Sequence, residues 1–203
     1  NLLGHENSLG GNLQKVKIAL QPHMETLIPR LLKACNDPNK ETKEKMCSLW
    51  VGLTAGGAQA RRLIDLHLIS IIDTLMKDAY SKLWRSRAAS CLALSEVIVG
   101  RSWDDLGGGT QRIQFDEVEF SENCGGTRLL KLFQLTIRAL DDVRIAVREA
   151  GESLGRSLKS LTNSLCSPSV ENNGDNPYGF INSMQEDLKA KSSVLVASTL
   201  IPW

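Results

Sequence analysis

The side chains that most often perform chemistry are few in this chain, and their spacing matches no catalytic or metal site. The three histidines, His5, His23 and His67, have no second histidine four residues away and no Glu-x-x-His spacing. Zinc sites on helices need such ligands on one face. We therefore expect no metal, and we interpret each histidine as solvated or bonded locally.

The cysteines give no clearer sign of chemistry. There are five, an odd number, and no Cys-x-x-Cys pair occurs. Cys91 and Cys124 could act as nucleophiles, but the sequence places no histidine or aspartate beside either of them as a base. We interpret Cys91 as a core residue and Cys124 as an incidental loop thiol. Unpaired thiols favour a reducing compartment, either cytoplasm or nucleus.

Two further patterns could carry chemistry in the middle of the chain. Asp104-Asp105 could form a pair of carboxylates, but acids at a helix end or in solvent explain them as well. The run Gly107-Gly108-Gly109-Thr110 lacks the lysine and the spacing of a phosphate-binding loop. We therefore expect no catalytic residue, no cofactor and no small-molecule substrate.

Composition limits the class of protein. Hydrophobic residues make up 42%, charged residues 23% and aromatic residues only 5%, with a net charge of +1. Leu, Ala, Ile and Val make up most of the hydrophobic residues, which favours helices. A balanced charge predicts no nucleic-acid surface, and no apolar run approaches the length that spans a bilayer.

The elements that would position any site share one pattern. Small and apolar residues recur at spacings of three and four in the segments 37–53, 81–100 and 142–161, which is typical of helices with one buried face. Each follows another helical segment (24–35, 59–77 and 127–140). We therefore predict paired helices, with a further helix over 182–201.

A basic residue marks the same place in each second helix. Lys43 and Arg87 are 44 residues apart, whereas Arg87 and Arg148 are 61 apart. Removing an insertion of about one and a half dozen residues restores the period of about 40 to 47 that HEAT and armadillo repeats have. Asp37, Ser81 and Asp142 each lie six residues before the basic residue.

This repeated frame predicts an all-α, HEAT/armadillo-like α-solenoid, a superhelical stack of antiparallel helix pairs cut from a longer chain. The acidic turn residue would cap the second helix, and the basic residue would bond to the turn of the neighbouring repeat. The alternative is an unrelated helical bundle, which the shared frame disfavours.

The pattern divides the chain into seven parts. These are a loop with the end of a preceding repeat (1–21), a HEAT repeat (22–57), a second (58–100), an acidic glycine-rich insertion (101–126), a third repeat (127–162), a loop (163–180) and the first helix of a truncated repeat (181–203).

The residues also resemble a known family. Asp37-Pro38-Asn39 through Trp50, the run Trp84-Arg85-Ser86-Arg87 through Leu94, and Gly100 through Asp105 are similar to the very large HEAT-repeat proteasome adaptor and scaffold proteins of the extracellular-mutant (ECM) class. The Trp-Arg-x-Arg run is more specific than the general repeat consensus. The resemblance implies a cytoplasmic and nuclear scaffold that binds the 26S proteasome and tethers its core to its regulatory particle.

We therefore expect a non-catalytic scaffold with a protein partner. Two alternatives remain: a HEAT scaffold of another system, such as nuclear transport or a phosphatase, and a small helical enzyme. Trp84 and Arg85 are candidate partner contacts because they lie at a turn before a helix, and Asp104 and Asp105 are two more. The acidic insertion is a hypothetical tether or docking segment.

Overall fold

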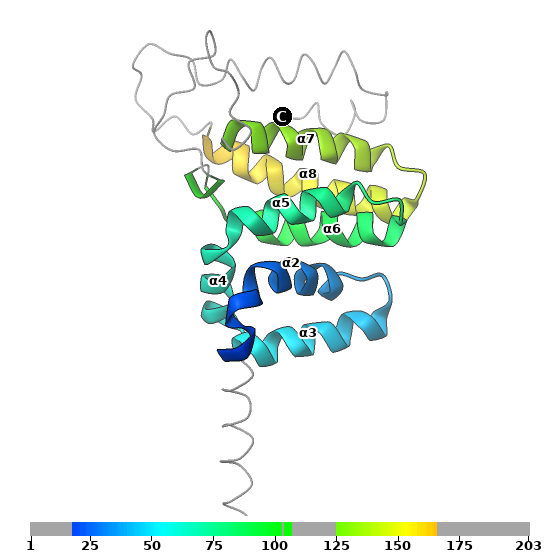
Figure 1. Cartoon of the computed structure of the whole chain (residues 1–203). Helices are drawn as coiled ribbons and strands as arrows, with labels where there is room; N and C mark the ends of the chain where they lie inside the picture. The colour runs from blue at the N-terminus through cyan, green and yellow to red at the C-terminus, as the bar shows by residue number, and fades with distance from the viewer. Residues whose placement is uncertain (1–17, 103, 107–124, 166–203) are drawn as a thin grey trace, which may run out of the picture.

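The computed structural model describes residues 18–102, 104–106 and 125–165, and all regular structure in these ranges is helical (Figure 1). Most of the predicted insertion 101–126, most of the loop 163–180 and the whole of 181–203 lie outside the described residues, as does nearly all of 1–21. The elements are η1 (Gln21–His23), α2 (Met24–Cys35), α3 (Lys40–Thr54), α4 (Gly57–Leu66), α5 (Leu68–Ala79), α6 (Trp84–Ile98), η2 (Asp104–Leu106), α7 (Gly125–Leu140) and α8 (Ile145–Leu165).

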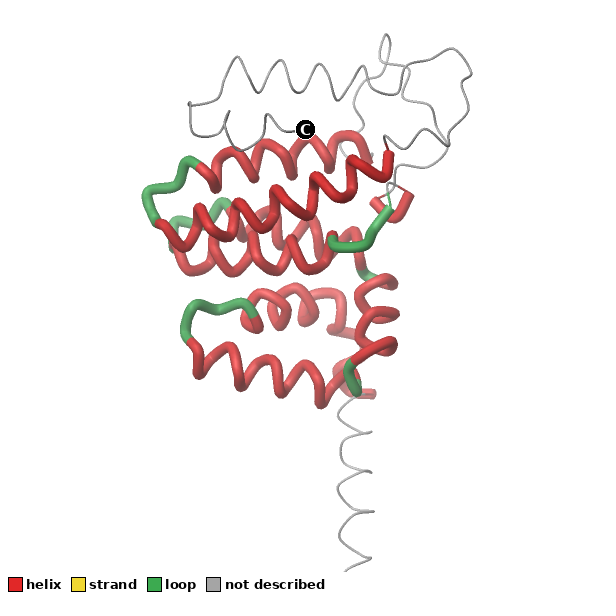
Figure 2. The backbone as a smooth tube through the Cα atoms, turned by 180° about the vertical axis from the view of Figure 1, so that it is seen from behind, coloured by secondary structure: helices red, strands yellow, loops and turns green. Residues whose placement is uncertain are grey.

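The helices form three antiparallel pairs, α2 with α3, α5 with α6, and α7 with α8, which are piled one on another (Figures 1 and 2). The α6 helix packs along α8, and α2 packs on both α5 and α6. The predicted all-α solenoid of stacked helix pairs is therefore confirmed.

Burial follows the helical period. In α5 the side chains of Ile71, Ile72 and Leu75 are fully buried, and they lie on the stripe that α2 and α6 cover. Corresponding stripes on α7 and α8 close the other side of the same core. A single pair could not bury these stripes, so stability comes from stacking.

The α6 helix is buried on more than one face. Its buried positions are Ala88, Ala89, Ser90, Cys91, Ala93, Leu94, Ser95, Val97 and Ile98. Most of these residues are small, which allows the backbones of α5 and α8 to approach α6 from two sides. The segment 81–100 is therefore the centre of the described stack.

The segment 59–77, predicted as one helical stretch, is two helices. The backbone leaves the helical region at His67 (φ −117°, ψ 16°), and α5 begins at the next residue. The α5 helix lies along the stack to bury Ile71 and Ile72, whereas α4 runs across it at one side (Figure 1). Periodicity alone did not show this change of direction.

The α3 helix is packed on one side only. Thr54 is its single buried residue. It contacts α2 and α4 but makes no comparable contact with α6, and Leu49 and Val51 are exposed. The second helices of the second and third pairs, α6 and α8, are thus in close contact. Those of the first and second pairs, α3 and α6, lie apart.

Candidate protein-interaction site

The three aligned turn residues occupy equivalent places in the structure. Asp37, Ser81 and Asp142 each lie three residues before the first residue of the second helix of their pair. In each, a side-chain oxygen accepts a hydrogen bond from the backbone N–H two residues later. The donors are Asn39 (2.7 Å), Leu83 (3.2 Å) and Arg144 (2.9 Å). The shared position therefore shapes the turn before the helix. The prediction that it caps the helix is wrong for α3 and α6, whose N-cap residues are Asn39 and Leu83.

Arg87 joins two neighbouring turns. Its Nε and Nη2 donate to the two carboxylate oxygens of Asp142, at 2.7 and 3.0 Å, in the next pair. Its Nη1 donates to the carbonyls of Ser81 (3.0 Å) and Lys82 (2.9 Å) in its own turn. Arg148 makes the same bond within its own turn: its Nη1 donates to the Asp142 carbonyl at 2.8 Å.

The carboxylate of Asp142 is stabilised in its ionised form. Burial opposes ionisation, but hydrogen bonds from Arg87 and from the Arg144 N–H, together with the charge of Arg87, outweigh that cost. The pKa of Asp142 is therefore below its ordinary value. A largely buried, bidentate Arg–carboxylate pair fixes orientation as well as distance.

Lys43, the third basic residue of the frame, takes no part in such a bridge within the described residues. It is exposed, and the facing turn carries Ser81 where the next turn carries Asp142. The first two pairs are instead joined by the Lys33–Asp78 ion pair and by Asn36, whose amide donates to Glu96 at 3.0 Å. Sequence comparison of the second helices did not indicate these contacts.

The four candidate contact residues do not form one site. Arg85 lies over the ring of Trp84, 5.6 Å from its centre, at the start of α6; Trp84 is half-buried and Arg85 exposed. Asp104 and Asp105 lie in η2, beyond the opposite end of α6. The Asp105 carboxylate accepts the Ser102 N–H at 2.7 Å, which, with the Ser102 hydroxyl and Arg101, lowers its pKa although burial opposes this.

Two of the three thiols that the structure describes, Cys91 and Cys35, are poorly placed for nucleophilic chemistry. Burial, with a smaller effect of the Asp142 charge, raises the pKa of Cys91 to about 12. Burial and the adjacent Cys47 thiol raise the pKa of Cys35 to about 12 as well. Both remain protonated near neutral pH and therefore unreactive. Cys124 lies outside the described residues.

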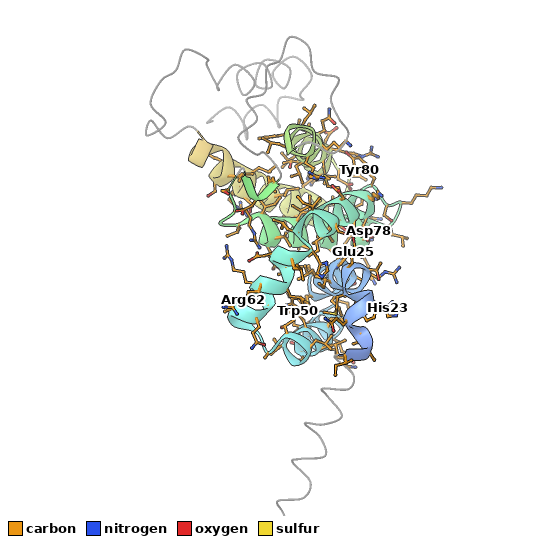
Figure 3. The ribbon with its side chains drawn as sticks, turned by 60° about the vertical axis from the view of Figure 1, so that its left-hand side comes forward. His23, Glu25, Trp50, Arg62, Asp78 and Tyr80 are labelled. Atoms are coloured by element: carbon orange, nitrogen blue, oxygen red, sulfur yellow. The ribbon has the colours of Figure 1, made fainter. Side chains whose placement is uncertain are left out.

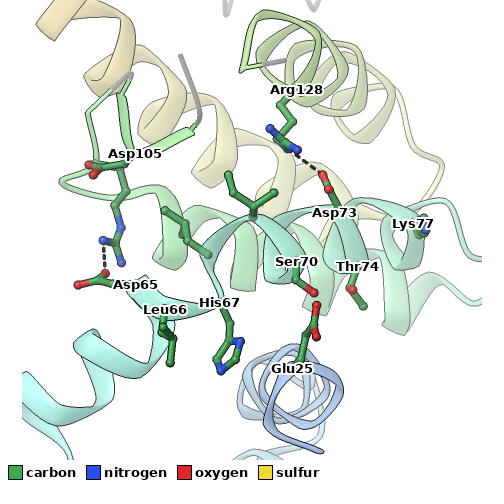
Figure 4. A pocket seen from close by; sticks show the side chains of 13 residues that line it. Glu25, Asp65, Leu66, His67, Ser70, Asp73, Thr74, Lys77, Asp105 and Arg128 are labelled. Carbon is green, nitrogen blue, oxygen red and sulfur yellow. Dashed lines mark hydrogen bonds and ion pairs between the residues drawn. The ribbon is translucent and has the colours of Figure 1, made fainter. Parts of the chain in front are cut away.

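A hollow of about 850 Å³ opens between α2, α4, α5, η2 and the start of α7 (Figure 4). Two ion pairs lie in it: Arg128 donates to Asp73 at 3.1 Å, and Arg101 pairs with Asp65. His67, Ser70 and Thr74 also line it. Within the residues that the structure describes, no three His, Cys, Asp or Glu side chains are grouped to hold a metal ion.

Sequence reasoning missed a group of exposed apolar side chains at the turns. Leu83 is 71% exposed, Val143 87% and Ile145 63%. Tyr80 is also exposed, and the guanidinium of Arg138 lies 5.0 Å from the centre of its ring. The available signal was Val143 itself, an aliphatic residue in the polar turn Asp141-Asp142-Val143-Arg144.

None of the helices in the described part of the chain combines the length and apolar character that crossing a membrane requires.

Comparison with known proteins identifies relatives. No family model matches the chain, and no solved structure does. The human proteasome adapter and scaffold protein ECM29 is 29% identical over 149 residues, which are 73% of this chain and 7% of that protein. The proteasome component ECM29 of Saccharomyces cerevisiae is 26% identical over 140 residues, 69% of this chain and 6% of that protein.

The chain thus spans only a small part of the length of these relatives. Two relatives that share the name ECM29, each matched across about 70% of the chain, confirm the resemblance that the Trp-Arg-x-Arg run indicated. The chain is similar to the ECM29 proteins, the class of proteasome adaptors and scaffolds.

Proposed function

We propose that this chain is a non-catalytic scaffold segment that binds the 26S proteasome and helps to hold its core and regulatory particles together. The similarity to two ECM29 proteins carries this proposal. The fold supports it, because stacked pairs bridged by Arg87 and Asp142 present surfaces at fixed separations.

The absence of catalysis is part of the proposal. The relatives are named as an adaptor and scaffold and as a proteasome component. In the described ranges, neither the buried Cys91 thiol nor the Arg128–Asp73 and Arg101–Asp65 ion pairs of the hollow offer an activated nucleophile with its base. An enzymatic role would need such a group.

The location and the acidic insertion belong to the same proposal. We infer a cytoplasmic and nuclear protein, as the resemblance implies, and fluorescence microscopy of the tagged chain tests this. The insertion 101–126 is proposed as a tether. Deletion of residues 107–124, which leaves η2 and α7 in place, is expected to reduce proteasome binding, and unchanged binding would remove that role.

Co-sedimentation tests the main proposal. Purified chain is mixed with purified 26S proteasome and separated on a density gradient. The chain is expected to move with the particle. A chain that stays at the top of the gradient would contradict the proposal and favour a scaffold of another system.

A further inference from the structure

The turns that join paired helices gather at one edge of the stack (Figures 1 and 2). The α5–α6 and α7–α8 turns are bound to each other by Arg87 and Asp142. Arg138 over the ring of Tyr80 makes a second link between them. Residues 80–85 and 138–145 therefore form one continuous surface, which we call the turn ridge.

The turn ridge is apolar where turns are usually polar. Leu83 and Val143 are 71% and 87% exposed, and Tyr80 and Ile145 extend the apolar area. Single exposed aliphatic residues are ordinary, but several gathered on two adjacent turns indicate a contact surface.

Comparison of the α7–α8 turn with the α5–α6 turn shows that the exposure of Val143 does not depend on whether a further helix pair is stacked beside it. In the repeat frame, Val143 and Arg144 correspond to Lys82 and Leu83. Lys82 and Leu83 remain exposed although their own helix pair, α5 with α6, has another pair stacked on each side of it. These two positions therefore point outward from the edge. Ile145 corresponds to the half-buried Trp84 and lies nearer the stacking face.

The turn ridge is also basic. Residues 80–85 and 138–145 hold four Lys and Arg side chains and two acids, Asp141 and Asp142, whereas the whole chain of 203 residues has a net charge of +1. Asp142 is neutralised by Arg87. The exposed cations are Lys82, Arg85, Arg138 and Arg144.

Three of these four cations are arginines. Guanidinium groups bind carboxylates through two parallel hydrogen bonds, and arginine and tyrosine are the residues on which protein interfaces most often depend. Neighbouring helices lie roughly 10 Å apart, so one peptide segment can contact both turns at once.

We propose that the turn ridge binds a segment of a partner protein in which acidic residues alternate with apolar ones. The apolar side chains of that segment contact Leu83 and Val143, and its carboxylates bind Arg85, Arg138 and Arg144. This inference rests on the proposed function only in taking the partner to be a protein.

Fluorescence anisotropy with the purified full chain tests the proposal. The probe is a short fluorescein-labelled peptide that alternates Glu with Leu, and a second probe has Lys in place of Glu. Phosphatidylserine vesicles form a third arm, because exposed aliphatic and basic side chains also suit an anionic membrane.

Two ridge variants and one control are compared with the wild-type chain. The ridge variants are Leu83→Ser with Val143→Ser, and Arg85→Glu with Arg144→Glu. The control, Val51→Ser with Arg62→Glu, removes an exposed valine and an exposed arginine from α3 and α4. Figure 3 shows Arg62 on the side of the molecule away from Tyr80.

The Glu peptide is expected to bind the wild type and the control equally, and each ridge variant at least about tenfold more weakly. Absence of binding, equal binding of the Lys peptide, an equal loss in the control, or binding to vesicles alone would overturn the proposal. No proteasome is present in this assay, so its outcome is independent of the co-sedimentation result.

Discussion

At the scale of single residues, the stack depends on the shape of one guanidinium group. Arg87 uses three nitrogens to bind a carboxylate in the next pair and two carbonyls in its own turn. A lysine ammonium cannot reproduce this planar arrangement of donors. Lys43, at the equivalent position, bridges no turns in the described structure, and α3 is correspondingly apart from α6.

Replacing Arg87 therefore tests this bridge. Arg87→Ala leaves Asp142, whose side chain is only 10% exposed, without its partner, and is expected to lower the free energy of unfolding by roughly 3 kcal/mol. Urea denaturation measures the effect. The control Arg156→Ala removes an exposed arginine beside Glu152 and should cost less than about 0.5 kcal/mol. Equal losses would contradict the assigned role.

The same pair predicts a dependence on pH. Because the native state lowers the pKa of Asp142, its ionised form adds stability above the ordinary carboxyl pKa of about 4. That contribution is lost as pH falls through the lower native pKa. The stability difference between wild type and Asp142→Asn should therefore shrink on acidification. Asp141→Asn controls for net charge, and a difference independent of pH would contradict the pairing.

Two glycines in helices should respond in opposite directions to alanine. A Cβ on Gly151 would lie 2.9 Å from the Ala139 Cβ and 3.1 Å from its backbone, whereas one on Gly52 meets nothing within 4 Å. Gly151→Ala is expected to destabilise the fold by about 1–3 kcal/mol through overpacking. Gly52→Ala should stabilise it by about 0.5–1 kcal/mol. Thermal denaturation of both variants checks the signs, and a stabilised Gly151→Ala would contradict the close approach of α7 and α8.

At the scale of elements, the sequence predicted the pairs but not the way in which they meet. Spacings of three and four located α2, α3, α6 and α8 closely, because a buried stripe must repeat with the helical period. The break at His67 and the crossing direction of α4 could not be predicted, because they depend on which neighbour covers each stripe. The contacts Lys33–Asp78 and Asn36–Glu96 join residues far apart in the chain, and local pattern does not report such pairs.

Because α3 and α6 are packed unequally, their backbone amides should be protected unequally from hydrogen exchange. The α6 helix lies against both α5 and α8, whereas α3 is covered mainly by α2. Amide hydrogen exchange in α3 is therefore expected to proceed through local opening, and exchange in α6 only through global unfolding. Mass spectrometry of exchanged peptides measures both. Equal protection of the two helices would show that the first pair is held as firmly as the others.

At the scale of the whole molecule, the candidate site was only partly predictable. Trp84 and Arg85 predict a contact at the turn before α6, since large aromatic and basic residues at a turn favour contact. Asp104 and Asp105 do not belong to the same site, because the structure places η2 beyond the far end of α6. Leu83 and Val143 become one surface only because Arg87 joins two turns about sixty residues apart, which composition does not show.

Electron cryomicroscopy of the purified chain mixed with purified 26S proteasome tests most directly whether an intact helical stack binds that particle. The expected result is added density that fits the three helix pairs as one rigid body. Proteasome particles without added density at saturating chain, or density in which the pairs have come apart, would contradict the proposed scaffold.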